Sequence, residues 1–139
     1  MTRQQRWAKE ALTRVGAHKG SESESKYRTL CMKMPALLKQ SGVVQSLAFM
    51  RARSGDEGRL FCDELAEVYG LPKQKEQSTG EALQHKAQEA ALAEYLVLSR
   101  ELIEISVWFR RFAQSELKEE NEDRTKSDQE QEGAHGGQT

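Results

Sequence analysis

Residues 26–53 read KYRTLCMKMPALLKQSGVVQSLAFMRAR, and apolar residues recur in them every three or four positions. This spacing places the apolar side chains along one side of a helix. The buried stripe expected before Gly42 consists of Tyr27, Leu30, Cys31, Met34, Leu37 and Leu38. Because proline lacks a backbone donor and clashes with the preceding turn, we expect a kink or break near Met34 and Pro35. After Gly42, a further helix over residues 43–53 carries Val43, Leu47 and Met50 on one ridge.

The same periodicity predicts helices on both sides of this stretch. Residues 2–16 form an amphipathic pattern whose apolar positions are Trp7, Ala8, Ala11, Leu12 and Val15. Residues 56–69 form another pattern, with Asp56 as its cap and a buried side made of Leu60, Phe61, Leu65 and Val68. Gly70 and Pro72 end this helix, since glycine tolerates the left-handed cap and proline cannot continue a helix.

The last helical pattern is too long for one helix of a compact domain. It opens at Ser78, three residues before Glu81 as in a capping box, and continues without Gly or Pro to Leu117. At about 1.5 Å per residue it would be roughly 55 Å long, so we expect a break near Ala90 or a projecting end. Residues 92–113 are apolar on more than one side, which is typical of a central helix or of a surface that binds a partner.

The composition is that of one small helical domain. The chain has 139 residues, 37% of them hydrophobic. It contains neither an apolar run of about 18 residues nor the apolar region of a secretory signal. We therefore expect a cytoplasmic, all-α protein with no membrane partner, a compact bundle of five or six helices over residues 1–117. Cys31 and Cys62 lie in apolar helical patterns and are expected to be buried thiols. Residues 118–139 contain no aromatic and no branched aliphatic residue, so we expect a disordered acidic tail there.

Charge is distributed unevenly, although the formal net charge is only −1. Residues 1–53 contain 11 Lys or Arg and 3 Asp or Glu, residues 54–117 contain 7 and 12, and residues 118–139 contain 3 and 7. The resulting charges are +8, −5 and −4. A polyanion would therefore be drawn to the N-terminal part of the chain.

No set of residues in the sequence is typical of an active site. His18, His85 and His135 lie in a linker, a helical turn and the tail, so we expect no base for a nucleophile and no metal cluster. We accordingly expect neither enzyme activity nor a cofactor. The acidic residues of the 56–69 helix scatter around it, and a solvated or partner-facing side is the preferred alternative to a divalent-ion site. These residues are Asp56, Glu57, Asp63, Glu64 and Glu67.

Basic residues are the stronger candidates for function. Lys26 and Lys33 are seven positions apart and share one flank of a helix. Arg51 and Arg53 lie at the end of the 43–53 helix, where either RNA or the helix dipole alone would explain them. No aromatic residues are interleaved with the basic ones in the manner of an RNA-recognition motif. Any nucleic-acid contact should therefore be to phosphate and shape.

Two blocks of the sequence follow a recognisable pattern. The block at 26–53 does so through Tyr27, Met34, Pro35, Ala36, Leu37, Leu38, Gly42, Val43, Val44, Gln45, Leu47, Ala48 and Phe49. The block EYLVLSRELIEISVWFRRFA at 94–113 does so through Tyr95, Leu96, Leu98, Ser99, Arg100, Glu101, Trp108, Phe109, Arg110, Arg111, Phe112 and Ala113. Together they resemble the small subunit of type III-B CRISPR effector complexes, the Cmr small-subunit family. The acidic tail, and SGVVQ in place of Asn-Gly-Leu, depart from the family pattern.

The resemblance implies a non-catalytic structural subunit of a ribonucleoprotein that acts in antiviral defence. Such subunits stack in several copies along the duplex of guide RNA and target RNA and contact other subunits of the Cmr complex. The RNA-facing candidates are Lys26, Lys33, Lys39, Gln45, Arg51, Arg53, Arg110 and Arg111. Self-association of the isolated chain is left open. The alternatives are the small subunit of a type III-A complex and a helical adaptor that binds protein through residues 92–113 without RNA.

Overall fold

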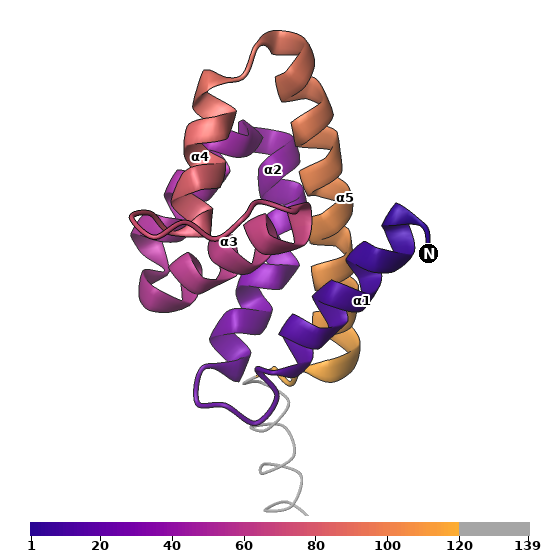
Figure 1. Ribbon diagram of the computed structural model, residues 1–139. Coiled ribbons are helices and arrows are strands. Elements are labelled where there is room, and N and C mark those ends of the chain that lie inside the picture. The colour runs from indigo at the N-terminus through magenta and orange to yellow at the C-terminus, as the bar shows by residue number, and fades with distance from the viewer. Residues whose placement is uncertain (120–139) are drawn as a thin grey trace, which may run out of the picture.

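The computed structural model describes residues 1–119, which form an all-α bundle without a strand (Figure 1). Its helices are α1 (Arg3–Gly16), α2 (Glu24–Arg53), α3 (Gly55–Tyr69), α4 (Thr79–Glu89) and α5 (Leu92–Glu116). The predicted fold class is confirmed, and the bundle has five helices, or six if the two segments of α2 are counted separately. The predicted acidic tail lies outside the described residues, apart from Lys118 and Glu119.

The backbone of α2 leaves helical geometry at Gly42 and not at Pro35. Gly42 has a φ of 78° and a ψ of 172°, a conformation that essentially only glycine adopts. The hydroxyl of Tyr95 on α5 accepts a hydrogen bond from the Val43 N–H at 3.1 Å and so caps the second segment. A break near Met34 and Pro35 is therefore wrong, because α2 continues through the buried Pro35 despite the missing backbone donor. A kink at this position stays a prediction.

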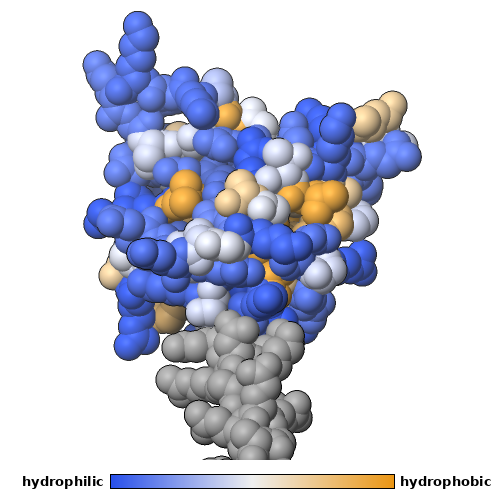
Figure 2. Space-filling model, turned by 90° about the horizontal axis from the view of Figure 1, so that it is seen from below, coloured by the Kyte–Doolittle hydropathy of each residue, from blue (hydrophilic) through white to orange (hydrophobic). Residues whose placement is uncertain are grey.

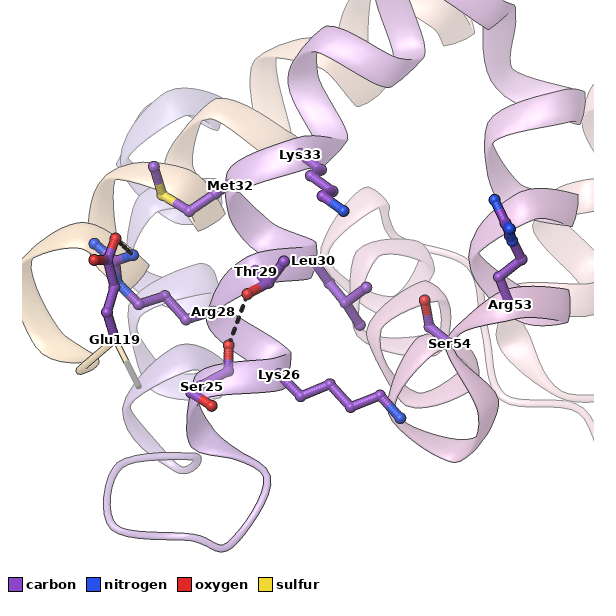
Figure 3. Close-up of a pocket in the computed structure, with 10 residues that line it drawn as sticks. All are labelled: Ser25, Lys26, Arg28, Thr29, Leu30, Met32, Lys33, Arg53, Ser54 and Glu119. Atoms are coloured by element: carbon purple, nitrogen blue, oxygen red, sulfur yellow. Dashed lines mark hydrogen bonds and ion pairs between the residues drawn. The ribbon is translucent and has the colours of Figure 1, made fainter. Parts of the chain in front are cut away.

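After Gly42 the chain reverses, so that the second segment of α2 folds back beside the first. Ser46 is fully buried, and its hydroxyl donates to the carbonyl of Leu37, nine residues earlier, at 3.0 Å. This hydrogen bond joins the two segments across the turn. The reversal brings the last residues of α2 level with its first turns, as Figure 3 shows for Arg53 and Lys33.

The core lies between α2, α3 and α5, and α1 packs mainly on α5. Tyr27, Phe61 and Phe109 form an edge-to-face series at its centre, with ring centroids 5.9 and 5.6 Å apart. Most of the predicted apolar stripes are buried. Leu12 and Leu60 are exceptions, with 40% and 45% of their surface exposed, because each lies at the edge of its stripe and turns outward. Cys31 and Cys62 are buried free thiols, as expected.

The long C-terminal pattern breaks where its length required. Ala90 and Ala91 are both extended and separate α4 from α5. Ser78 caps α4 by accepting a hydrogen bond from the Glu81 N–H at 3.2 Å, as the capping-box spacing predicts. Asp56, in contrast, lies in the first turn of α3, and Ser54 precedes that helix as its N-cap residue. No helix of residues 1–119 combines the length and the apolar character needed to cross a bilayer.

Candidate nucleic-acid interface

Three of the predicted RNA-facing residues line one groove on the surface of the bundle. The groove has a volume of about 750 Å³ and lies between the first turns of α2 and the junction of α2 with α3 (Figure 3). We call it the outer groove. It is lined by Ser25, Lys26, Arg28, Thr29, Leu30, Met32, Lys33, Arg53, Ser54 and Glu119. Lys26, Lys33 and Arg53 thus come together from positions up to 27 residues apart in the sequence.

The side chains of Lys26 and Lys33 point from α2 toward the segment that carries Arg53 (Figure 3). Lys33 and Arg53 are exposed and form no ion pair with any residue in the range 1–119. Lys26 pairs with Glu57 at 3.1 Å, and both partners are partly open to solvent. An exposed pair of this kind contributes little to stability, so the ammonium group stays available to an anion. The Arg53 guanidinium lies 5.4 Å from the ring centre of Phe49.

Arg51 is separated from Arg53 by the geometry of the helix. It turns away from the outer groove toward α4, where it donates to Gln84 at 2.6 Å and to Glu81 at 2.9 Å. Two residues along a helix correspond to a rotation of about 200°, so neighbouring arginines at this spacing point to opposite sides. Arg51 is therefore used in joining α2 to α4.

The other predicted RNA-facing residues do not line the outer groove. Lys39 and Gln45 are exposed on α2, on either side of the break. Arg110 and Arg111 are exposed on α5, and the Arg111 guanidinium lies 5.3 Å from the ring centre of Trp108. Their contact with RNA stays a prediction, as it does for the residues of the groove.

Arg28, Ser25 and Thr29 also line the groove and are not among the predicted RNA-facing residues. Arg28 forms an ion pair with Glu119 at 2.5 Å, and the two hydroxyl residues line the groove along α2. The repeat Ser25, Thr29, Lys33 at four-residue spacing was the available signal, because it marks one exposed line along α2.

The opposite side of α2 carries a buried polar network that the sequence analysis also missed. Glu64 on α3 accepts a hydrogen bond from the Tyr27 hydroxyl at 2.5 Å and lies 2.8 Å from His18 Nε2. The His18 ring stacks on Tyr27 with the ring centres 3.5 Å apart. We call these three residues the inner network. It ties the α1–α2 connection to α3, so its role is structural support for the first turns of α2.

Burial raises the pKa of two groups of the inner network, Glu64 and Tyr27. Loss of solvation raises the pKa of Glu64, while its hydrogen bonds to Tyr27 and His18 act in the opposite direction. Burial also raises the pKa of the Tyr27 hydroxyl, with smaller contributions from Cys31 and Glu64. The interpretation of Glu64 as part of a solvated side is thus wrong. Glu64 follows Phe61 by three residues and precedes Val68 by four, so it shares their side of the helix. This spacing was the signal that could have predicted its burial.

The remaining acidic residues of α3 do not converge. Glu57 pairs with Lys26, Glu67 pairs with Arg14 at 3.3 Å, and Asp63 accepts a hydrogen bond from the Gly80 N–H at 2.8 Å. Within residues 1–119, no group of three His, Cys, Asp or Glu side chains is arranged to hold a metal ion. The acidic side of α3 therefore serves contacts with α1, α2 and α4.

A second exposed feature lies at the other end of the bundle, around the turn between α4 and α5 (Figure 1). Leu92, Leu96 and Val97 are 74%, 59% and 46% exposed, and we call them the apolar tip. The opposite end, seen from below in Figure 2, is mostly hydrophilic with small separate apolar patches. A concentration of large apolar side chains in one place is typical of a surface that contacts another protein.

Comparisons with known proteins agree with this architecture. Residues 3–116 match the family described as CRISPR-associated protein (Cas_Cmr5). The CRISPR system Cmr subunit Cmr5 of Thermus thermophilus is 36% identical over 118 residues, which cover 85% of this chain and 98% of that protein.

The crystal structure of a CRISPR-associated Cmr5 family protein from Thermus thermophilus has the same fold, with a TM-score of 0.77 and 34% identity. The match covers 85% of this chain and 100% of that one. These matches are to a Cmr family, so they favour the type III-B resemblance over the type III-A alternative. The chain therefore belongs to the CRISPR-associated Cmr5 family.

Proposed function

We propose that this chain is a structural, non-catalytic subunit of a type III-B RNA-guided effector complex, in which several copies stack along the duplex of guide RNA and target RNA. Family membership supports the place in a Cmr complex. The outer groove supports the contact with RNA, and the apolar tip supports the contact with other subunits. The complex would act in the cytoplasm in antiviral defence.

The observation that carries the RNA contact is the convergence of Lys26, Lys33 and Arg53 on one groove. Lysine and arginine bind phosphate through charge-assisted hydrogen bonds, and this recognition is independent of base sequence. Hydroxyl groups of Ser25 and Thr29 line the same groove, although Thr29 already donates to the carbonyl of Ser25 at 3.0 Å. The groove thus offers backbone contacts and no base-edge readout, which suits a subunit that must accept guides of any sequence.

The apolar tip supports a second role in assembly. Three large apolar side chains are in unfavourable contact with water, and their burial against another subunit would contribute about 25 cal/mol for each Å² covered. Because the outer groove and the apolar tip lie at different ends of the bundle (Figure 1), one copy would contact RNA and a neighbouring protein at the same time. Affinity for RNA would then grow with the number of stacked copies.

The proposal is tested by isolating the tagged full-length chain from its native host and sequencing the RNA and protein that accompany it. We expect short repeat-derived guide RNAs together with other Cmr subunits. The double variant Lys33→Glu, Arg53→Glu should keep its fold and its protein partners, but less RNA should cross-link to it. Lys75→Glu, an exposed residue outside the groove, should behave like the native chain.

The main alternative is a helical adaptor that binds only protein, and the exposed apolar tip is the observation in its favour. An adaptor would bring down protein partners without RNA, and its binding would be lost in Leu92→Asp and Leu96→Asp but not in Lys33→Glu. Recovery of protein without any guide RNA would therefore contradict the proposed function.

A further inference from the structure

The described chain ends at the edge of the outer groove, beside Arg28 (Figure 3). The N–H of Lys118 donates to Glu24 at 3.0 Å, and the Glu119 carboxylate pairs with Arg28 at 2.5 Å. Glu119 is itself one of the residues that line the groove, together with Lys33 and Arg53 (Figure 3). These two contacts fix the point from which the remaining residues 120–139 continue.

The residues that follow have the charge that the groove would bind. Between 119 and 132 the sequence contains seven acidic residues, Glu119, Glu120, Glu122, Asp123, Asp128, Glu130 and Glu132, and only two basic ones, Arg124 and Lys126. We call residues 119–132 the acidic segment. The family match ends at residue 116, so the segment is an addition to the helical unit that the family shares.

Distance does not prevent the acidic segment from reaching the free cations. The groove runs across the exposed side of α2, and a helix with its side chains is about 10 Å wide. An extended chain advances about 3.3 Å per residue, so three or four residues beyond Glu119 cross that width. The thirteen residues from 120 to 132 could extend about 43 Å, which is several helix widths and leaves enough chain to pass Lys33 and continue toward Arg53 across the groove (Figure 3).

We propose that the acidic segment occupies the outer groove in the absence of RNA and competes with RNA for Lys33 and Arg53. A tethered segment acts at an effective concentration of about millimolar, which is sufficient for weak, purely ionic contacts. RNA with many phosphates would displace it, whereas a short or single anion would not. The segment thereby makes the groove selective for long RNA, such as that of an assembled complex.

The docking of the segment can be tested without RNA. A nitroxide label at Ser127→Cys reacts selectively, because Cys31 and Cys62 are fully buried. We expect the label to broaden the amide signals of Lys33 and Arg53 more than that of Ala91, because Ala91 lies in the connection between α4 and α5, and this connection is at the opposite end of the bundle (Figure 1). The difference should disappear at high salt and in Lys33→Glu, Arg53→Glu, while Lys75→Glu should retain it. Equal broadening at all three amides would overturn the proposal.

The competition is tested with a fluorescent oligouridylate at low salt. Deletion of residues 120–139, and replacement of the six acidic residues after Glu119 by their amides in the full chain, should each tighten RNA binding about two- to tenfold. Identical dissociation constants for the native and both altered chains would overturn the competition. The competition rests on the proposed function, but the docking does not. If no form of the chain binds RNA while the broadening persists, the proposed function fails and the docking stands.

Discussion

The two sides of α2 use charge in opposite ways. On the inner side, Glu64 is 7% exposed and its carboxylate contacts both Tyr27 and His18. On the outer side, Lys33 and Arg53 are exposed and unpaired within the part of the chain that the structure describes. The inner carboxyl group is used in folding through its hydrogen bonds, whereas the outer charges are free for a ligand. Changes on the inner side should therefore alter stability, and changes on the outer side should alter binding alone.

The largest effect is expected for Tyr27→Ala on the inner side. The variant loses a fully buried ring that stacks on His18 and contacts Phe61, and it leaves Glu64 with one partner fewer. We expect the free energy of unfolding to fall by about 3–5 kcal/mol, measured by urea denaturation. Tyr27→Phe, which removes only the hydroxyl, should cost about 0.5–1.5 kcal/mol. Equal stability of Tyr27→Ala and the native chain would show that the inner network does not support the fold.

Gly42→Ala should have the next largest effect, because Gly42 forms the turn at which α2 folds back on itself. Its positive φ is strained for alanine, and the added Cβ would lie 2.9 Å from the Tyr95 hydroxyl. We expect a loss of about 1–3 kcal/mol in the free energy of unfolding. Since the turn places Arg53 beside Lys33, RNA binding should weaken as well. Gly16→Ala is the control, because a Cβ there meets no atom within 4 Å, and its stability should stay within about 0.5 kcal/mol of native.

Arg51 and Arg53 directly test the difference between residues that join helices and residues that are free to bind RNA, because the same substitution is made two positions apart. Arg51→Ala removes contacts with Gln84 and Glu81, which are partly exposed, so the loss of stability should be only about 0.5–1 kcal/mol. Arg53→Ala should leave stability unchanged and lower the slope of RNA affinity against salt by about one ion. If Arg51→Ala weakens RNA binding as much as Arg53→Ala does, the separation of these two arginines into a structural and an RNA-binding residue is wrong.

The smallest effect is the pH dependence contributed by Glu64. Its pKa in the folded protein is raised above the ordinary glutamate value, so the folded state binds more protons than the unfolded state in the pH range between the two. The contribution of Glu64 to stability is therefore complete below the ordinary glutamate pKa and is lost as pH rises through the raised value. Glu64→Gln should remove this dependence. If the stability of the native chain relative to Glu64→Gln instead increases with pH across this range, the pKa of Glu64 is not raised by folding.

Local sequence patterns predicted the helices well because helical spacing reports directly which residues share a side. The stripe through Tyr27, Met34 and Leu38, the break at Ala90 and the stop at Gly70 all follow from spacing or from backbone chemistry. The break allowed for at Pro35 did not occur, since buried packing around the proline offsets one lost hydrogen bond.

The candidate site was predicted only in part, because it depends on which segments meet in space. Nothing in the spacing of Lys33 and Arg53 shows that the chain reverses between them at Gly42. Proximity in sequence was also misleading, since Arg51 and Arg53 point to opposite sides of their helix. Partners from distant helices, such as His18 for Glu64, likewise become visible only when the fold is known.

The most direct measurement is ultraviolet cross-linking of the ribonucleoprotein isolated from the native host, followed by mass spectrometry of the peptides that carry nucleotides. We expect adducts on the peptides that contain Lys33 and Arg53, and a lower yield of adducts in the double variant Lys33→Glu, Arg53→Glu. If guide RNA is present in the complex and the adducts lie only on other parts of the chain, such as Arg110 and Arg111, the outer groove is not the RNA contact.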